Sequence, residues 1–195
     1  MKGIKERSWR YWAGRHTLAI ALLPVLAATL SGPGTAIAAD QSDVETRIKD
    51  AFIYNFARFV EWPAHANPGP MRIGVLGRGD LASPLEDIVR GKLVNGRPIQ
   101  VVHISVVTEA DCCEILLIER SESSHLKEIA QALAEKPILT VCDSGNCLRD
   151  GVMIGFRIVE ETVRFQINQE AAQHAGLIIS SQLLKVAIPS ARQHP

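Results

Sequence analysis

The chain has 195 residues, with 21 Lys and Arg against 21 Asp and Glu, so its formal net charge at neutral pH is zero. Five of these bases and one acid lie in residues 1–38, which leaves 16 bases and 20 acids in the other 157 residues and a net charge of about −4 there. A phosphate polyanion needs clustered Lys and Arg, so this charge excludes a basic nucleic-acid-binding body. The hydrophobic content of 47% excludes a disordered chain, and the length predicts one domain.

The first 38 residues have the three parts of a secretory signal peptide. A basic segment precedes an apolar run at residues 17–30, and small residues follow up to Ala36-Ile37-Ala38. The run is shorter than the 18 or more residues that span a bilayer, and it contains Pro24. We expect cleavage after Ala38 and a mature protein, residues 39–195, in the periplasm. An uncleaved anchor is the alternative.

The mature chain is predicted to begin with a helix at about residues 43–61. Ser42-Asp-Val-Glu45 is a capping box, in which the Ser hydroxyl and the Glu carboxylate each satisfy a free amide of a new helix. Trp62-Pro63 ends the helix because the residue before proline avoids helical angles. The apolar side chains that follow at helical spacing, and that we expect to face the core, are Ile48, Phe52, Phe56 and Phe59.

Short apolar segments then alternate with helical ones. Predicted strands lie near residues 72–76, 99–104, 115–118 and 138–141, and predicted helices lie near residues 84–90 and 123–134. Strands that are apolar on both faces imply helices covering a mostly parallel sheet. We therefore predict a single three-layer α/β domain at residues 39–195, with a mostly parallel central sheet flanked by helices.

A β-hairpin is predicted at residues 152–159 and 162–167. Its second strand alternates, with inward Val163, Phe165 and Ile167 and outward Arg164 and Gln166. The Glu160-Glu161 turn is not of the favoured Asn-Gly type, so its geometry stays open. Asn168 is predicted to cap a short helix that Gly176 closes, Ser180 or Ser181 to cap a last helix, and residues 188–195 to form a loose tail.

Motifs for catalysis are absent from the sequence. Gly77-Arg-Gly79 follows a strand, as a phosphate-binding turn does, but the third glycine is missing, so we interpret it as a tight turn. No Gly-x-Ser-x-Gly elbow surrounds a serine, and no histidine has a second ligand at a zinc-like spacing. We expect a protein that is not an enzyme and that uses no metal or cofactor.

Four cysteines remain after the predicted cleavage, and in an exported domain an even number indicates disulfides. Cys142 and Cys147 flank the turn sequence Asp-Ser-Gly-Asn, and closing so short a loop stabilises by roughly 2 kcal/mol, so we predict this bridge. Cys112 and Cys113 are adjacent in the chain. Their alternatives stay open: a strained bond to each other, a free buried thiol, a bond between subunits, or pairing with the 142/147 loop.

Aromatic residues are concentrated in the first predicted helix, where five of the seven that follow the leader lie within residues 52–62. Tyr54, Arg58 and Trp62 fall on a face of that helix away from its core residues. These residue types dominate interface energies, so the face is a candidate docking or dimer surface, and coverage by the sheet or by the Pro-rich link is the alternative. Met153 and Gln166 of the hairpin, expected to point outward, are the competing candidates.

Two parts of the chain are similar to the YfiR family of exported bacterial regulators. The first is residues 51–63, AFIYNFARFVEWP, and the second is residues 153–156, MIGF, continued by VRFQIN at 163–168 and SSQLL at 180–184. The resemblance implies a small periplasmic α/β domain, often a dimer, that binds and represses the inner-membrane diguanylate cyclase YfiN. It also implies an outer-membrane lipoprotein of the YfiB type as antagonist, and an output through cyclic-di-GMP.

The resemblance also bears on the cysteines. Cys113 is similar to a family cysteine that bonds to one near the second strand, where this chain has Gly74 instead. That bond cannot form here, which puts redox control by the family's route in doubt. A periplasmic small-molecule receptor, using the crevice at the strand ends, is the second hypothesis for function, and a thiol–disulfide enzyme is the third.

Overall fold

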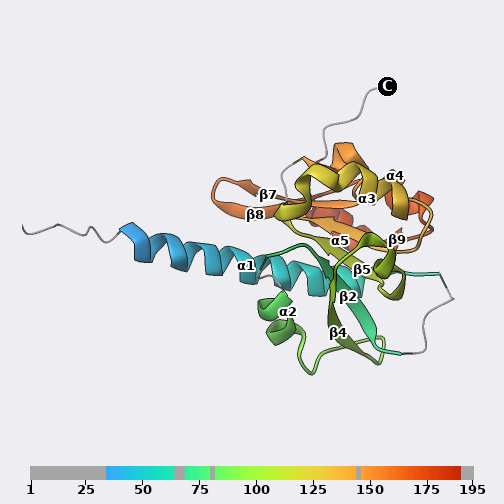
Figure 1. Ribbon diagram of the computed structural model, residues 1–195, viewed down its shortest axis with the longest axis horizontal. Coiled ribbons are helices and arrows are strands. Elements are labelled where there is room, and N and C mark those ends of the chain that lie inside the picture. The colour runs from blue at the N-terminus through green and yellow to red at the C-terminus, as the bar shows by residue number, and fades with distance from the viewer. Residues whose placement is uncertain (1–33, 64–68, 80–81, 144–145, 190–195) are drawn as a thin grey trace, which may run out of the picture. The chain divides into compact units, whose positions relative to one another are not determined.

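The computed structural model describes residues 34–63, 69–79, 82–143 and 146–189 (Figure 1). The α-helices there are α1 (Gly34–Phe59), α2 (Ala82–Val89), α3 (Leu126–Leu133), α4 (Gln169–His174) and α5 (Ser181–Val186), and short 3-10 helices span Val107–Cys112, Arg120–His125 and Cys147–Asp150. The strands are β1 (Val60–Glu61), β2 (Met71–Leu76), β3 (Leu93–Val94), β4 (Arg97–Ile104), β5 (Ile115–Ile118), β6 (Leu139–Cys142), β7 (Ile154–Val159), β8 (Thr162–Ile167) and β9 (Ile178–Ile179). Within these ranges no helix is both long enough and apolar enough to cross a membrane.

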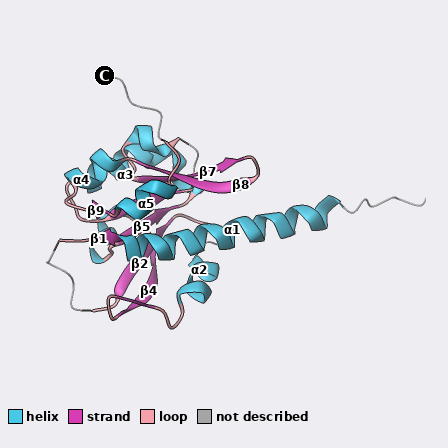
Figure 2. Cartoon of the chain, turned by 180° about the vertical axis from the view of Figure 1, so that it is seen from behind, coloured by secondary structure: helices cyan, strands magenta, loops and turns pink. Residues whose placement is uncertain are grey.

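The main sheet has seven strands in the order β3-β4-β2-β5-β6-β7-β8. Figure 2 shows its strands in magenta, with β2 beside β4 and with β7 beside β8. The five strands from β4 to β7 are parallel to their neighbours, while β3 and β8 pair antiparallel at the two edges. A separate two-stranded sheet pairs β1 with β9, also antiparallel. The predicted α/β domain with its C-terminal hairpin is therefore confirmed, and the prediction of a mostly parallel sheet holds for the centre but not for the edges.

Helices cover both faces of this sheet, because its central strands are apolar on both sides. Alternate residues of a strand point to opposite faces. Ile73, Ile115 and Leu139 join the core cluster under α1 and α2, whereas Leu76, Leu116 and Ile118 join the cluster under α3. The three layers follow from this alternation.

Helix α1 differs from its prediction at both ends. It begins at Gly34 instead of near Ser42, since the Ala-rich segment before the predicted cap has high helix propensity, and the Ser42 carbonyl accepts an intrahelical bond from Thr46 Oγ1. It ends at Phe59 because the next two residues pair with β9. Residues 1–33 of the predicted leader lie outside the described ranges.

The predicted core face of α1 is only partly right. Phe56 is fully buried and stacks near Phe156 and Phe165, with ring centroids 5.9 and 5.0 Å away. Ile48 instead lies 39% exposed, and Asp50, near which the docking face was expected, is 1% exposed. The strip of α1 that packs on the sheet is rotated from the one that the phenylalanine spacing indicated.

The C-terminal segment follows its sequence signals. The hairpin forms with Val163 and Phe165 buried, and its turn places Glu160 and Glu161 at φ values of 48° and 59°, the left-handed geometry that favours Asn-Gly. Ser180, not Ser181, caps α5. Asn168 caps α4 and Gly176, at φ 74°, follows its end, both as predicted. Of the predicted tail, Ile188 donates its amide to Phe165, and residues 190–195 lie outside the description.

Candidate functional site

The carboxyl ends of β2, β5 and β6 meet at one edge of the parallel sheet, which is where open α/β domains place their ligand crevices. Glu119 directly follows β5 and Asp143 directly follows β6. Helix α1 brings Lys49 and Asp50 to the same edge. Charged residues that are far apart in the sequence therefore meet between α1 and the strand ends.

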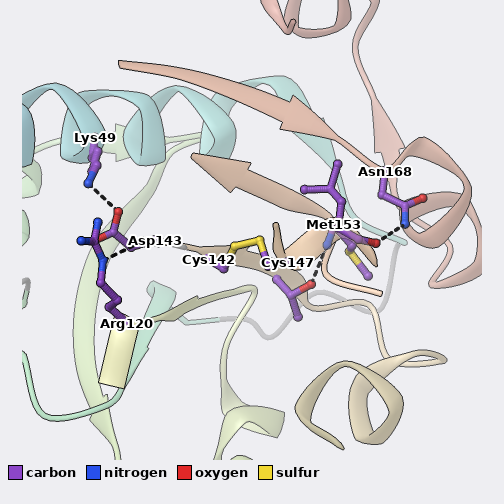
Figure 3. Close-up of a disulfide and its surroundings, with 9 residues drawn as sticks. Lys49, Arg120, Cys142, Asp143, Cys147, Met153 and Asn168 are labelled. Carbon is purple, nitrogen blue, oxygen red and sulfur yellow. Dashed lines mark hydrogen bonds and ion pairs between the residues drawn. A yellow bond between two sulfur atoms is a disulfide. The ribbon is translucent and has the colours of Figure 1, made fainter. Parts of the chain in front are cut away.

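A buried lysine joins helix α1 to the end of β6. Lys49 Nζ lies 2.5 Å from Asp143 Oδ1 and 2.5 Å from Glu45 Oε1, with the lysine only 6% exposed (Figure 3). Arg120 reaches the other Asp143 oxygen at 3.7 Å and donates to the Asp143 carbonyl at 3.3 Å. A buried ion pair of this kind costs several kcal/mol when one partner is removed, because the other charge stays buried.

Asp50 lies beside this ion pair without a hydrogen-bond partner on either carboxylate oxygen. Burial raises the pKa of Asp50 from 3.8 to about 7, against the opposing effect of Lys49, and the Asp143 charge adds to the rise. The group therefore changes charge near neutral pH. Its position was missed by sequence reasoning, although a Lys-Asp pair within the apolar face of a helix is a signal that could have indicated it.

A pocket of about 360 Å³ opens beside the ion pair. Its lining residues come from α1, from the ends of β5 and β6, and from β7: Glu45, Lys49, Arg120, Asp143, Phe156, Arg157 and Ile158. The lining combines three cationic and two anionic side chains with two apolar ones. The arrangement suits a small ligand that carries charges of both signs better than a purely apolar one.

The Gly77-Arg-Gly79 turn is filled by a side chain of the protein itself. Gly79 N donates to the Glu119 carboxylate, and Arg78 N donates to Ser121 Oγ at 3.0 Å. A Cβ atom at Gly77 or Gly79 would lie 2.7 or 2.6 Å from Glu119 atoms, so both glycines serve the approach of this carboxylate. An anion site at this turn would need Glu119 to leave, which supports the interpretation as a structural turn.

The predicted bridge between Cys142 and Cys147 is present, with Cα atoms 6.6 Å apart (Figure 3). Both cysteines are buried, and they pack against β7 at Gly155. A Cβ at Gly155 would lie 2.8 Å from Cys147 Sγ and 2.6 Å from Leu148 Cδ1. The glycine of the MIGF segment is therefore required by the bridge packed against it.

Cys112 and Cys113 are free thiols whose sulfurs lie 3.3 Å apart, so of the open alternatives the chain has no bond between them or to the 142/147 loop. The pKa of Cys113 is raised to about 12, mainly by burial and to a smaller extent by the hydrogen bond with Cys112. A thiol with so high a pKa is protonated at neutral pH and is a poor nucleophile. This disfavours the hypothesis of a thiol–disulfide enzyme.

The face predicted from Tyr54, Arg58 and Trp62 is divided. Trp62 follows β1 instead of lying on the helix, packs on the core and donates Nε1 to the Glu114 carbonyl at 3.0 Å, which is the structural role that the alternative foresaw. Arg58 is exposed, with its guanidinium carbon 5.7 Å from the Tyr54 ring centroid, and Lys92 Nζ lies 4.3 Å from the same centroid. Tyr54 and the two cations therefore form a small surface patch.

The competing candidates on the hairpin side do not form a surface. Met153 is 2% exposed, so the expectation that it points outward is wrong; it precedes β7 and its backbone amide donates to Thr140 Oγ1 in the core. Gln166 is half-buried, and its Nε2 donates to the Pro189 carbonyl at 2.9 Å. Its outward side chain holds the C-terminal segment against β8.

Most of the domain matches a known protein family. Residues 46–188 match the family model described as YfiR/HmsC-like. No curated protein matches the chain. The matched range runs from the middle of α1 to two residues beyond α5, and so includes both cysteine pairs, the Tyr54 patch and all of the strand-end pocket except Glu45.

Proposed function

The chain belongs to the YfiR/HmsC-like family, and we propose that it binds the periplasmic domain of an inner-membrane diguanylate cyclase of the YfiN type and represses it. The observation that carries the proposal is the extent of the match, which spans most of the domain instead of one motif. The family suggests a periplasmic regulator of diguanylate cyclase signalling, and the predicted signal peptide agrees with that compartment. In this proposal the protein acts by contact alone, without catalysis or a cofactor.

Repression by contact is a population shift. A cyclase with active and inactive conformations is kept inactive only if the repressor binds the inactive one more tightly, by about 5 kcal/mol for a change from 1:99 to 99:1. Rigid elements suit this task because they lose little entropy on binding. Helix α1, which carries Tyr54 and Arg58, is packed against α2 and the sheet.

The surface proposed to contact the cyclase is the patch of Tyr54, Arg58 and Lys92. It combines the Tyr54 ring with Arg58 of the same helix and with Lys92 of the link between α2 and β3, and Tyr and Arg are among the residues that dominate interface energies. The cations favour an acidic partner surface. An outer-membrane lipoprotein of the YfiB type would compete for the repressor and release the cyclase.

Charge reversal tests this surface. We expect Arg58→Glu to weaken binding of the purified cyclase periplasmic domain at least tenfold, and to raise cyclic-di-GMP in cells that express the cyclase. Arg90→Glu is the matched control, since Arg90 is exposed and ion-paired with Asp87 on α2, outside the patch. Equal binding by both variants would place the docking surface elsewhere, and no binding by the wild type, with cyclic-di-GMP unchanged on gene deletion, would contradict the repressor itself.

The second candidate function is a periplasmic small-molecule receptor, which the 360 Å³ strand-end pocket favours. A ligand that binds only the folded state raises the melting temperature as its concentration exceeds its Kd. We expect a thermal-shift screen of zwitterionic metabolites to separate the candidates. A hit that Lys49→Met abolishes would support the receptor, and a screen without hits would favour repression by contact.

A further inference from the structure

Another pocket, the α3–α4 pocket, lies at the other end of the strands from the strand-end pocket. It has a volume of about 320 Å³, and its lining comes from α3, α4, the start of β6, the 3-10 helix that ends at Asp150, and the chain just before β7 and just after β8. Figure 3 shows Met153 and Asn168 of this lining on one side of the disulfide, with the Lys49–Asp143 ion pair on the other. The two pockets are therefore separate sites.

The inner part of the α3–α4 pocket is apolar. Ala130 and Leu133 of α3 and Met153 before β7 are buried side chains that line it. Ala134, directly after α3, and Ala171 of α4 also line it, and their small side chains leave the space between the two helices open. A ligand with a hydrocarbon part gains free energy by burying that part here.

The charged groups of the lining are two carboxylates. Asp150 is half-buried and Glu170 is exposed, and neither has a hydrogen bond or an ion pair with any residue that the structure describes. None of the described residues that line this pocket is a lysine or an arginine. With a neutral histidine, the formal charge of the lining is therefore −2, whereas the strand-end pocket combines three cationic with two anionic side chains.

The other polar groups of the lining add an acceptor or are already bonded. His174 Nδ1 lies 3.3 Å from the Ala134 carbonyl oxygen, so a neutral ring donates there and keeps Nε2 as an acceptor. Asn168 Oδ1 accepts an amide of α4 at 3.1 Å, and Thr140 Oγ1 accepts the Met153 amide at 3.0 Å. The groups that a ligand meets are thus mainly acceptors, which a ligand with several donors satisfies.

We propose that the α3–α4 pocket binds a small organic amine. In this arrangement the ammonium group meets the carboxylates of Asp150 and Glu170, and the hydrocarbon part covers Leu133 and Met153. Two like charges that line one pocket raise each other's energy, and a cation between them lowers the energy of both. A protonated amine supplies that cation together with three hydrogen-bond donors.

The size of the pocket favours an organic cation over a bare metal ion. A water molecule occupies about 30 Å³ in the liquid, so a ligand of about ten non-hydrogen atoms fills the space. A metal ion would leave the apolar part of the pocket in contact with water. Solvent screens the exposed Glu170, so we expect a dissociation constant of about 1 mM. The inference does not rest on the proposed contact with a cyclase.

Titrations of the purified protein, followed by NMR, test the proposal. The probes are phenethylamine and hexylamine, and the neutral molecules of matched shape are phenethyl alcohol and hexanol. We expect both amines to cause saturable shifts of the backbone resonances around Asp150 and Glu170. Both alcohols should bind at least tenfold more weakly, and high salt should weaken the binding of the amines because it screens the carboxylates.

Variants locate the site. We expect the double variant Asp150→Asn, Glu170→Gln to weaken amine binding at least tenfold, and Glu86→Gln, at an exposed acid of α2, to leave it unchanged. Ala134→Leu narrows the pocket and should weaken the binding of every probe, whereas Ala132→Leu, at an exposed position of α3 outside the lining, should not. Circular dichroism and the melting temperature confirm that each variant is folded.

Several results would overturn the proposal. The absence of a saturable shift from either amine up to about 10 mM would mean that the pocket takes no such ligand. Equal binding of the amines and the alcohols would show a pocket that does not select charge. Amine binding that the double variant leaves intact belongs to another site, and larger shifts with magnesium chloride than with the amines would assign the two carboxylates to a metal ion.

Discussion

Two regions on the α3 face of the sheet, one around Cys142 and one around Cys113, have three features in common. Each has a buried cysteine and an acidic residue directly after it, Asp143 or Glu114. Each also has a glycine in a neighbouring strand, Gly155 or Gly74, whose missing Cβ leaves room for a sulfur: a Cβ would lie 2.8 Å from Cys147 Sγ in the first region and 2.9 Å from Cys113 Sγ in the second.

The regions differ in what the sulfur meets. Cys142 bonds to Cys147, five residues away, and their Cα atoms lie 6.6 Å apart. Within the chain Cys113 has only its neighbour Cys112 within reach, and adjacent residues cannot bring their sulfurs together without strain, so neither forms a bond there. Sequence separation and the identity of one facing residue therefore decide whether a buried cysteine is bridged within the chain.

The acidic residues differ as well. Glu114 is paired on both oxygens, with Arg97 Nη2 2.5 Å from Oε1 and the Arg72 amide 2.8 Å from Oε2. Asp143 shares Lys49 with Glu45 and lies near Asp50, which has no partner. Of the two regions, the one around Cys142 therefore has a buried carboxyl group without a hydrogen-bond partner, that of Asp50.

The largest expected effect is a pH dependence that comes from Asp50. Its pKa is about 7 in the folded protein and near 3.8 when unfolded, so between these values the folded state binds more protons and stability falls as pH rises. Three pKa units correspond to about 4 kcal/mol. We expect the free energy of unfolding of Asp50→Asn, relative to that of the wild type, to rise by about this much from pH 4 to pH 8. Urea unfolding measures it. Asp43→Asn, exposed on the same helix, is the control, and parallel profiles for wild type and Asp50→Asn would contradict the assignment.

Replacing Gly155 and Gly74 by alanine compares how far the neighbouring sulfur can move in each of the two cysteine regions. The Cβ of Gly155→Ala meets a bridged sulfur that cannot rotate away, so we expect a loss of about 3 kcal/mol in the free energy of unfolding. The Cβ of Gly74→Ala would lie 2.8 Å from Ile104 Cγ1 and 2.9 Å from Cys113 Sγ. Because the free thiol can turn, only Ile104 must shift, and a loss of about 1–2 kcal/mol is expected. Gly69→Ala, with open space around it, should stay within about 0.5 kcal/mol of the wild type. Equal losses at 155 and 74 would show that the bridge adds no rigidity.

Removal of the bridge is expected to cost less. The loop-entropy account predicts that the double variant Cys142→Ala, Cys147→Ala loses about 2 kcal/mol of stability. Reductant should lower the wild type by a similar amount and leave the double variant unchanged, in chemical unfolding with and without dithiothreitol. A similar loss on Cys112→Ala, whose residue is unbridged, would mean that packing and not the covalent bond accounts for the difference.

The smallest net effect is expected from converting the second region into the first. A Cβ at Gly74 would lie about as far from Cys113 Sγ as a bridge requires, so Gly74→Cys should bond to Cys113 when oxidised glutathione accepts the two electrons. A loop of this length gains about 4 kcal/mol, and overpacking by a cysteine side chain at this crowded position costs about 3 kcal/mol, which leaves a net gain of about 1 kcal/mol. Thiol counting measures the bond, and Gly74→Ser is the control of equal shape. A variant that keeps all its thiols would refute the facing geometry.

Much of this fold could be predicted because it depends on neighbours in the sequence. Strand β5 at Ile115–Ile118 follows from its apolar run, the caps at Asn168 and Ser180 from their own side chains, and the Cys142–Cys147 bridge from the turn between them. The strands that were missed, β1, β3 and β9, have two residues each, too few to show a period.

The candidate site was harder to predict than the fold. Lys49 and Asp143 are 94 residues apart, and their charges alone do not distinguish a buried pair from two surface groups. Met153 and Ile48 were each assigned to the wrong side, because one apolar residue fits either the core or an exposed stripe until the packing partner is known.

The sequence by itself determined the α/β class, the order of the longer helices and strands, the local bridge and the family, since these follow from short-range spacing and from local motifs. The tertiary structure alone decided which face of α1 is buried, which glycine each sulfur meets, and that Asp50 lies unpaired beside Lys49. These depend on contacts between distant segments, whose geometry is set only when both helix layers pack on the sheet.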